Sequence, residues 1–336
     1  MVYCHECSGH NSERKGTALE QSRLPESQAC AILQHVRERA GTRSTSRLVG
    51  VHRDTVTRYI RIAGEQAQQL HQELLAYSPN TREVQLDEKW SFVGKKEAGC
   101  SESEKEEAKV GENWDHTAID AEHRLLLALV PGKRTAAHCQ QIIAEVKQRT
   151  GGRSDLLLSS DEHPPYRTAI KKSYAQKHSV PEPAVNEPST KSAPLLPDQL
   201  VYVTVKKERK QGRVIKVYQT LVFGTSMMLA LLLNRSTVSS GINTAFVERH
   251  NGTDRHQNAR KVRKTYGFSK DWDVHNAASY FVGFSYNFCW PVRTLRIKKE
   301  NGHWQQRTPA MAAGLADHLW TLQEWLTYPA KLVKSI

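Results

Sequence analysis

The first quarter of the chain has hydrophobic residues at helical spacing. One stripe of residues 26–40 is apolar, and its members are Ala29, Ile32, Leu33, Val36 and Ala40. This spacing predicts a helix that Gly41 ends. A short second helix is expected over 44–49 and a third over 53–62, with a tight turn at Gly50-Val51 between them. Such an arrangement is typical of a helix-turn-helix unit, whose last helix lies in the major groove of DNA.

The third of these helices is expected to have an apolar side and a polar side. Its outward residues carry guanidinium and hydroxyl groups, namely Arg53, Thr55, Thr57, Arg58 and Arg61. Side chains of these types bind phosphates and base edges, so all five are candidate DNA-binding residues. An ordinary three-helix packing unit is the alternative interpretation. Either way, residues 21–77 are predicted to form a separate helical domain.

After a polar linker around residues 77–80, the pattern changes from helical spacing to alternation. Residues 84–92 place Val84 and Leu86 on one side and polar residues on the other, which predicts a strand with two distinct faces. Asp87 lies on the polar face, whereas its neighbour Glu88 shares the apolar face. The alternation therefore favours Asp87 over Glu88 as a functional residue.

The rest of the chain alternates between strand and helix patterns. Strands are expected at 116–120, 125–130 and 155–160, with a helix from Thr135 to about Arg149 before the last of them. A proline-rich insertion covers 178–199, followed by a hairpin of 201–205 and 213–222 and a short apolar helix over 226–234. A further helix begins at Asn243 or Thr244, aromatic residues over 277–290 are expected to pack in the core, and a C-terminal helix is expected over 308–325. This order predicts an α/β fold.

Three acidic residues lie at the ends or on the polar sides of these elements. They are Asp87 on a strand, Asp161 at the carboxyl end of a second strand, and Glu248 in the first turn of a helix. Asp161 and Glu248 are each in a position where an acidic residue commonly caps a helix or offsets its dipole. If the three converge, their carboxylates suit a pair of Mg²⁺ or Mn²⁺ ions about 3.5–4 Å apart, which drive in-line phosphoryl transfer.

Basic residues accompany Glu248 along its helix. Arg255 is expected on nearly the same face, and a cluster follows it that contains Arg260, Lys261, Arg263 and Lys264. Such a cluster favours a phosphate ligand. The composition agrees, since 48 Lys and Arg against 35 Asp and Glu give a net charge of +13. A surplus of this size is typical of a polyanionic partner, although a generically basic protein is the alternative.

Other signals limit where the protein works. No segment has the pattern of a secretory signal, and the longest apolar block, residues 227–233, is far too short for a membrane span. Six scattered cysteines fit a reducing cytoplasm, and we expect a cytoplasmic, nucleoid-associated protein without membrane contact. Cys4 and Cys7 form one C-x-x-C knuckle, and a zinc ribbon needs two. His10 and Cys30 do not complete it at a standard spacing, so zinc binding here is doubtful.

The strings around the three acids resemble the catalytic blocks of bacterial insertion-sequence DDE transposases, most closely the IS-one-like group. The matching strings are Leu86-Asp87-Glu88-Lys89-Trp90-Ser91-Phe92-Val93, Ser160-Asp161-Glu162-His163-Pro164-Pro165-Tyr166, Val247-Glu248-Arg249-His250-Asn251 and Arg307-Thr308-Pro309-Ala310-Met311. The resemblance implies a ribonuclease H-like mixed sheet flanked by helices over 82–300, with a helical tail over 301–336. It also implies that residues 1–20 are the second half of a zinc ribbon.

The resemblance implies an activity and a set of roles. Asp87, Asp161 and Glu248 would be the catalytic, metal-binding triad, which selects Asp161 over Glu162. Arg255 would lie beside the DNA end. The protein would bind terminal inverted repeats and catalyse strand cleavage and 3′-end transfer, as a homo-oligomer on DNA. Two alternatives stay open, namely a non-catalytic DNA-binding regulator of the element and a nuclease of the same fold.

Overall fold

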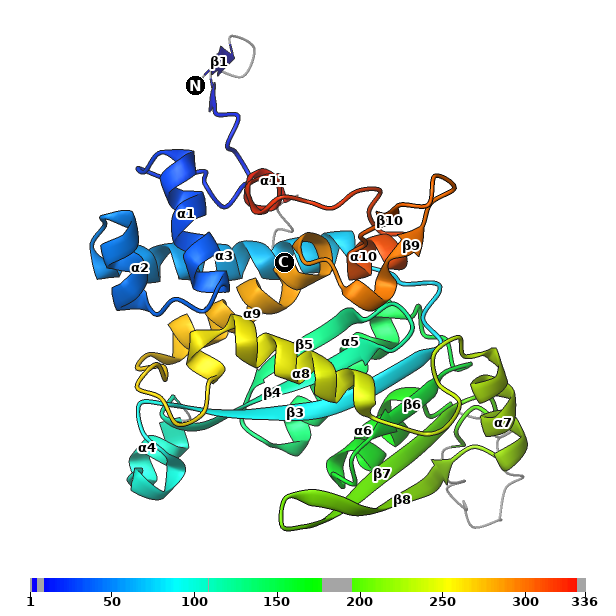
Figure 1. The fold of residues 1–336 in the computed structure, drawn as a ribbon. Helices are drawn as coiled ribbons and strands as arrows, with labels where there is room; N and C mark the ends of the chain where they lie inside the picture. Colours follow the sequence, from blue (N-terminus) through cyan, green and yellow to red (C-terminus); the bar gives the residue numbers. More distant parts are fainter. Residues whose placement is uncertain (1, 5–8, 108, 177–194, 331–336) are drawn as a thin grey trace, which may run out of the picture.

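The computed structural model describes residues 2–4, 9–107, 109–176 and 195–330, and its centre is one mixed sheet of six strands (Figure 1). The strands are β3 (Glu83–Val93), β4 (Gly111–Asp120), β5 (Leu125–Gly132), β6 (Leu157–Ser160), β7 (Val201–Lys210) and β8 (Arg213–Phe223). Their order in the sheet is β5-β4-β3-β6-β7-β8. The three strands β5, β4 and β3 are antiparallel, whereas β3, β6 and β7 run parallel. This order is consistent with the ribonuclease H-like core that the sequence predicted.

Helices cover both faces of this sheet. On one face, α5 (Ala136–Arg149) and α6 (Pro165–Tyr174) share a hydrophobic core with Leu125 and Leu127 of β5. On the other face, α9 (Trp272–Cys289) packs against Leu126 and Leu129 of the same strand. Alternate residues of β5 therefore face opposite layers, which explains why this strand is continuously apolar.

The N-terminal helices are α1 (Glu26–Arg37), α2 (Thr42–Val49) and α3 (Arg53–Leu74). All three were expected, but α3 does not end near residue 62 because Ala63, Ala67 and Leu70 continue its buried stripe. This extension packs on α9 so closely that a Cβ on Gly64 would lie 2.5 Å from the Cα of Ala277. One hydrophobic core therefore joins the N-terminal helices to α9 (Figure 1).

The C-terminal region differs from its prediction. Thr308 caps a helix as expected, since its hydroxyl accepts a hydrogen bond from the Met311 amide. The expected helix over 308–325 is wrong, however, because α10 (Pro309–Ala312) ends before Gly314, whose φ is +77°. A separate helix, α11 (Leu322–Thr327), begins at a capping box formed by Thr321 and Glu324.

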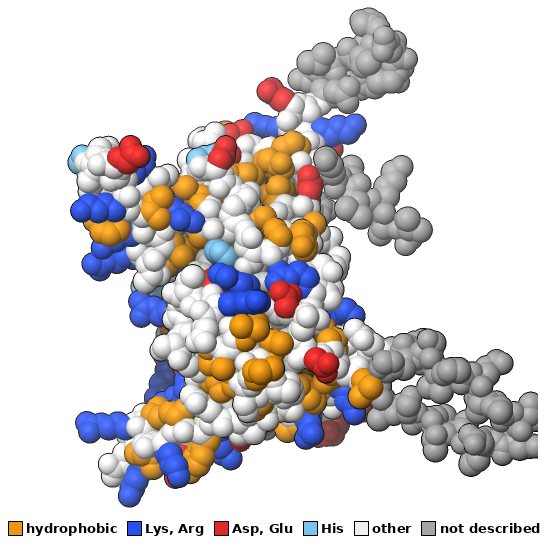
Figure 2. All heavy atoms as spheres, turned by 90° about the vertical axis from the view of Figure 1, so that its right-hand side faces the viewer, with side chains coloured by type: hydrophobic (Ala, Val, Ile, Leu, Met, Phe, Trp, Pro, Cys, Tyr) orange, Lys and Arg blue, Asp and Glu red, His pale blue; other side chains and the backbone are white. Residues whose placement is uncertain are grey.

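The remaining α-helices and β-strands include α8, which covers β3, and several short elements. They are β1 (Val2–Cys4), β2 (Gly9–Asn11), α4 (Glu102–Glu107), α7 (Ser226–Arg235), α8 (Ala245–Gln257), β9 (Ile297–Lys298) and β10 (Trp304–Gln305). Cys7 and residues 178–194 of the proline-rich insertion lie outside the described residues, as does the side chain of Cys4. Within the described ranges, no helix has both the length and the hydrophobicity to cross a membrane. Figure 2 shows hydrophobic and basic side chains interspersed along the lower edge of the molecule, where the β7–β8 hairpin lies.

Candidate active site

Asp87 projects from the face of β3 that α8 covers. Its Oδ1 accepts a hydrogen bond from the Glu88 amide at 2.8 Å, and its Oδ2 accepts one from Asn251 Nδ2 of α8, also at 2.8 Å. Burial raises the pKa of the Asp87 carboxyl to about 6, and the negative charges of Asp161 and Glu248 add to that shift. The carboxylates of Asp161 and Glu248 therefore interact electrostatically with that of Asp87.

Asp161 follows directly after β6, the parallel neighbour of β3. Because Val84 pairs with Leu158 and Gln85 with Ser159, both strands run toward the same edge of the sheet. Asp161 Oδ1 accepts a hydrogen bond from the His163 amide at 3.1 Å, and its other oxygen lies 3.7 Å from Arg134 Nη2. Nearly half of its side chain is exposed, so a ligand in solution can reach it.

Glu248 lies in the first turn of α8, and β3 itself anchors that turn. Gln85 Oε1 accepts hydrogen bonds from the backbone amides of Phe246 at 2.9 Å and Val247 at 3.1 Å. The N-terminus of α8 is therefore fixed to the strand two residues before Asp87. Glu248 accepts a hydrogen bond from the Thr244 hydroxyl at 2.6 Å and forms an ion pair with Lys207 of β7.

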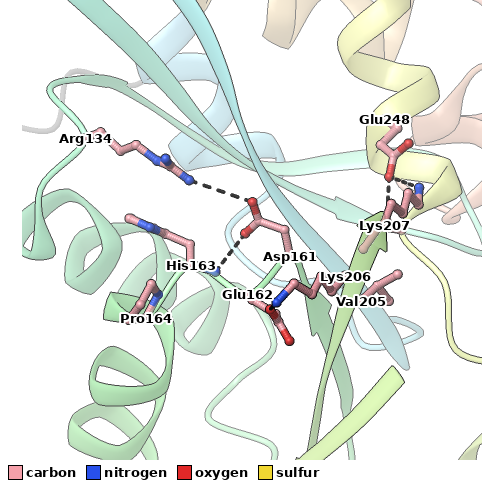
Figure 3. Close-up of a pocket in the computed structure, with 10 residues that line it drawn as sticks. Arg134, Asp161, Glu162, His163, Pro164, Val205, Lys206, Lys207 and Glu248 are labelled. Atoms are coloured by element: carbon pink, nitrogen blue, oxygen red, sulfur yellow. Dashed lines mark hydrogen bonds and ion pairs between the residues drawn. The ribbon is translucent and has the colours of Figure 1, made fainter. Parts of the chain in front are cut away.

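Asp161 and Glu248 line the same cleft, whose volume is about 460 Å³. Figure 3 shows Asp161 with Arg134 on one side of it and Glu248 with Lys207 on the other. Lys206 also lines the cleft and pairs with Glu162 at 3.1 Å. The cleft thus combines exposed carboxylates with three cations.

The three acids do not meet at a single point. Among the described residues, the one group of at least three His, Cys, Asp or Glu side chains with ligand atoms within 4.8 Å of one another is Glu88, Cys139 and His163. The fold therefore brings Asp161 and Glu248 to one cleft beside Asp87, while Glu248 faces Lys207 and Asp161 faces Arg134.

A buried ionic network lies beside Asp87 on the same face of β3, and the sequence analysis missed it. Lys89 is 1% exposed and pairs with Asp254 of α8 and with Asp115 of β4, the latter at 3.2 Å. Lys261 pairs with Asp115 as well. These neighbouring cations hold the pKa of the Asp115 carboxyl well below its usual range, although its burial acts in the opposite direction. The alternation of polar and apolar residues places Lys89 on the same polar face of the strand as Asp87, but it gives no sign that Lys89 is buried.

The structure divides the basic cluster after α8 into two parts. Arg260 and Lys261 were expected to contact phosphate, but both are buried, with Arg260 Nη2 donating to Thr42 Oγ1 at 3.0 Å. Both side chains bind partners inside the protein, so the structure does not place them where they could contact a phosphate. Arg263 and Lys264 are exposed and line a hollow of about 610 Å³ beside Trp90. Arg255 is half-buried, and burial lowers the pKa of its guanidinium.

The candidate DNA-binding residues of α3 lie at or near the surface. Arg53, Arg58 and Arg61 are exposed, and Thr55 and Thr57 are partly exposed. Arg61 forms an ion pair with Asp271 at 3.1 Å. Arg53 and Thr57 line a second hollow of about 610 Å³, together with the exposed Lys270.

Comparison with known proteins does not show which family the chain belongs to. No protein-family model matches the chain, and no curated protein matches it. Among solved structures, the Mos1 transposase paired-end complex with left transposon end matches 49% of this chain and 57% of that chain, at 16% identity and a TM-score of 0.18. A pre-cleavage Mos1 transpososome matches 49% of this chain and 59% of that chain, at 13% identity and a TM-score of 0.19. The aligned region thus spans less than two thirds of either protein, and superpositions with such low TM-scores say nothing about the activity of this chain.

Proposed function

We propose that the chain is a DDE-type DNA transposase, in which Asp87, Asp161 and Glu248 hold two Mg²⁺ or Mn²⁺ ions. One observation carries this proposal. Asp161 and Glu248 line one cleft, and their negative charges add to the effect of desolvation in raising the pKa of Asp87. Three carboxylates at such close range repel one another, and bound cations would relieve that repulsion.

The donor set fits a hard divalent cation. Carboxylate oxygens are the ligands that Mg²⁺ prefers, and Asp161 and Glu248 are both open to solvent. Each of these two carboxylates now has a protein cation beside it, Arg134 for Asp161 and Lys207 for Glu248. A metal ion at Glu248 would displace the Lys207 ammonium, which would then be free to bind a DNA phosphate in the same cleft.

The chain's own residues would act by position and charge. When bound, the metal ions supply an activated water or 3′ hydroxyl and stabilise the leaving oxygen. Arg134, Lys206 and Lys207 would bind the phosphates around the scissile bond, since all three line the cleft. Arg255, Arg263 and Lys264 would bind the DNA that flanks it.

The exposed side of α3 would recognise the terminal inverted repeats. Arg53, Thr55, Thr57, Arg58 and Arg61 are accessible there, as a recognition helix requires. Two DNA ends must be handled in one reaction, so we expect a homo-oligomer on DNA. This function also accounts for the net charge of +13.

A strand-transfer assay tests the proposal. The full chain is incubated with Mg²⁺, a supercoiled target plasmid and linear duplexes that carry the DNA flanking its own gene. We expect joined products from the wild type and from Asp155→Asn, an acid that pairs with Arg153 outside the cleft. Asp87→Asn should still bind the duplexes but give no joined product.

Each alternative function has its own outcome in this assay. Cut ends without joined product would identify a nuclease and contradict the proposal. Retained DNA binding with no cutting by the wild type, and a regulatory effect that Asp87→Asn leaves intact, would identify a DNA-binding regulator.

A further inference from the structure

Glu88, Cys139 and His163 come together from three different elements. Glu88 lies on β3, Cys139 on α5, and His163 in the turn between β6 and α6. One potential ligand atom from each of these residues lies within 4.8 Å of the others. All three belong to the side of the sheet that α5 and α6 cover. This cluster adjoins the proposed Mg²⁺ ligands, because the His163 amide donates to Asp161, but it shares no side chain with them.

The cluster contains a buried polar atom that lacks the partner such an atom normally has. Glu88 is 7% exposed, and Arg134 binds only its Oε2, with Nε at 3.2 Å and Nη2 at 2.9 Å. His163 Nε2 is buried without a hydrogen-bond partner among the described residues, whereas the buried Tyr166 hydroxyl donates a hydrogen bond to the Glu88 carboxylate. A buried polar atom without a partner is unfavourable. An unpartnered imidazole nitrogen beside a carboxylate and a thiol indicates a ligand that binds all three groups.

The chemistry of these donors selects the ligand. A thiolate, an imidazole and a carboxylate are the three side chains that bind Zn²⁺, whereas Mg²⁺ and Ca²⁺ avoid sulfur. Tetrahedral Zn²⁺ bonds of about 2.0–2.3 Å put ligand atoms roughly 3.5 Å apart. The cluster is already within range of this geometry. One thiolate and one carboxylate would also neutralise the charge of the ion.

His116 lies beside this donor set. Its Nδ1 lies 3.8 Å from Cys139 Sγ, and its Nε2 lies 3.2 Å from the Lys133 carbonyl oxygen. A backbone carbonyl that accepts from one ring nitrogen leaves the other free to bind metal. Burial lowers the pKa of His116 to about 4, which keeps this imidazole neutral at pH 7.

We propose that Glu88, Cys139 and His163 form a Zn²⁺ site with three protein ligands, the fourth position being open to water. Binding would release the Cys139 proton to solvent and form a Zn–S bond, with no change in oxidation state. The site would connect β3, one residue after Asp87, to the turn that follows Asp161. It would fix the relative position of these two acids, which is a role the proposed function does not assign to any residue. His163 also lines the cleft, which gives the ion a path from solvent.

Cobalt spectroscopy on the full chain tests this proposal. Cys4 and Cys7 are first replaced by serine, because that knuckle is itself a potential zinc ligand. The chelator-stripped protein is then titrated with Co²⁺ and with Zn²⁺. We expect one equivalent to bind, with a thiolate-to-cobalt charge-transfer band that Zn²⁺ abolishes. Cys139→Ser should remove the band and lower zinc affinity by about 100-fold or more.

Two further variants separate this site from the rest of the protein. Cys289→Ser is the matched control, because Cys289 is also a buried free cysteine but lies on α9, away from the cluster. Asp161→Asn should leave zinc binding unchanged even where it abolishes DNA chemistry, so failure of the proposed function would not affect this result. Absence of the charge-transfer band in the parent protein would overturn the proposal, whether or not Cys139→Ser folds. So would unchanged zinc affinity in folded Cys139→Ser.

Discussion

The two faces of strand β3 are both buried, but different forces hold them. On one face, Val84 and Leu86 pack among apolar residues of α5 and α6. On the other, Gln85, Asp87 and Lys89 each contact a polar partner on α8. Val84 and Leu86 on the first face need only shape and volume from their neighbours, whereas Gln85, Asp87 and Lys89 each need a specific donor, acceptor or charge opposite them.

This difference determines which amino-acid substitutions each face tolerates. An apolar contact loses part of its free energy when a neighbour shrinks, but no atom is left in an unfavourable state. A buried charge that loses its partner keeps its full desolvation penalty. The polar face should therefore be the more sensitive of the two, and it is also the face that carries Asp87. Three substitutions on β3 test this view, in order of expected effect.

Replacing Lys89 should have the largest effect. Lys89→Met removes the ammonium between Asp115 and Asp254 and leaves the shape of the side chain similar. We expect the free energy of unfolding to fall by about 3–5 kcal/mol, because Asp254 would remain buried without a cation while Lys261 retains Asp115. Urea unfolding followed by circular dichroism measures this change.

An exposed ion pair supplies the control. Lys95 pairs with Glu104 at 2.8 Å, but nearly half of its side chain is in solvent. Lys95→Met should change stability by less than about 1 kcal/mol. Equal losses in the two variants would show that the buried network has no special role, and the contrast between the two faces would then fail.

The sequence predicted the apolar face better than the polar one. Alternation placed Val84 and Leu86 on one side and Asp87 on the other, because strand periodicity depends only on neighbouring residues. The same reasoning could not find the Lys89–Asp254 pair, whose members are far apart in the chain. It also assigned Arg260 and Lys261 to phosphate binding, because the sequence does not show that Lys261 pairs with an acid on β4 or that Arg260 binds a hydroxyl on α2.

Helix ends could likewise be predicted only where neighbouring residues determine them. The end of α5 was predictable because Gly151 and Gly152, both with positive φ, follow it directly. The extension of α3 to Leu74 was not, since it depends on α9 as a packing partner. The sequence placed the three acids on the right elements, but it could not predict that Lys207 and Arg134 would engage two of them.

Replacing Asp87 should stabilise the protein in the absence of divalent metal. The folded-state pKa of about 6 exceeds the ordinary value of 3.8, so the folded state binds more protons between these two pH values. Stability must then fall as pH rises through this window. Asp87→Asn removes that loss, and a flip of Asn251 would bring its unpartnered Oδ1 to the new amide. We expect a gain of about 2 kcal/mol at pH 7.5 and none at pH 4.

Thermal unfolding with chelator at both pH values measures this gain. Adding Mg²⁺ should then stabilise the wild type more than Asp87→Asn, because the variant lacks one of the three proposed carboxylate ligands. A variant that is less stable than the wild type at pH 7.5 with chelator would contradict the view that the charge of Asp87 is unfavourable in this fold.

The smallest of the three effects should come from Gln85, which carries no charge. Gln85→Met keeps the volume of the side chain but leaves the amides of Phe246 and Val247 without their acceptor. Loss of a helix cap of this kind destabilises a protein by about 1–2 kcal/mol.

The loss of stability should be concentrated in the first turn of α8, so amide hydrogen exchange should accelerate at residues 245–248 more than in α5. Gln219→Met is the control, because Gln219 also contacts the backbone near the start of α8, where its Nε2 donates to the Ile242 carbonyl, but it is exposed. If exchange in α8 were unchanged in Gln85→Met, the strand would not hold the helix, and the position of Glu248 relative to Asp87 would have to depend on the Asn251 hydrogen bond instead.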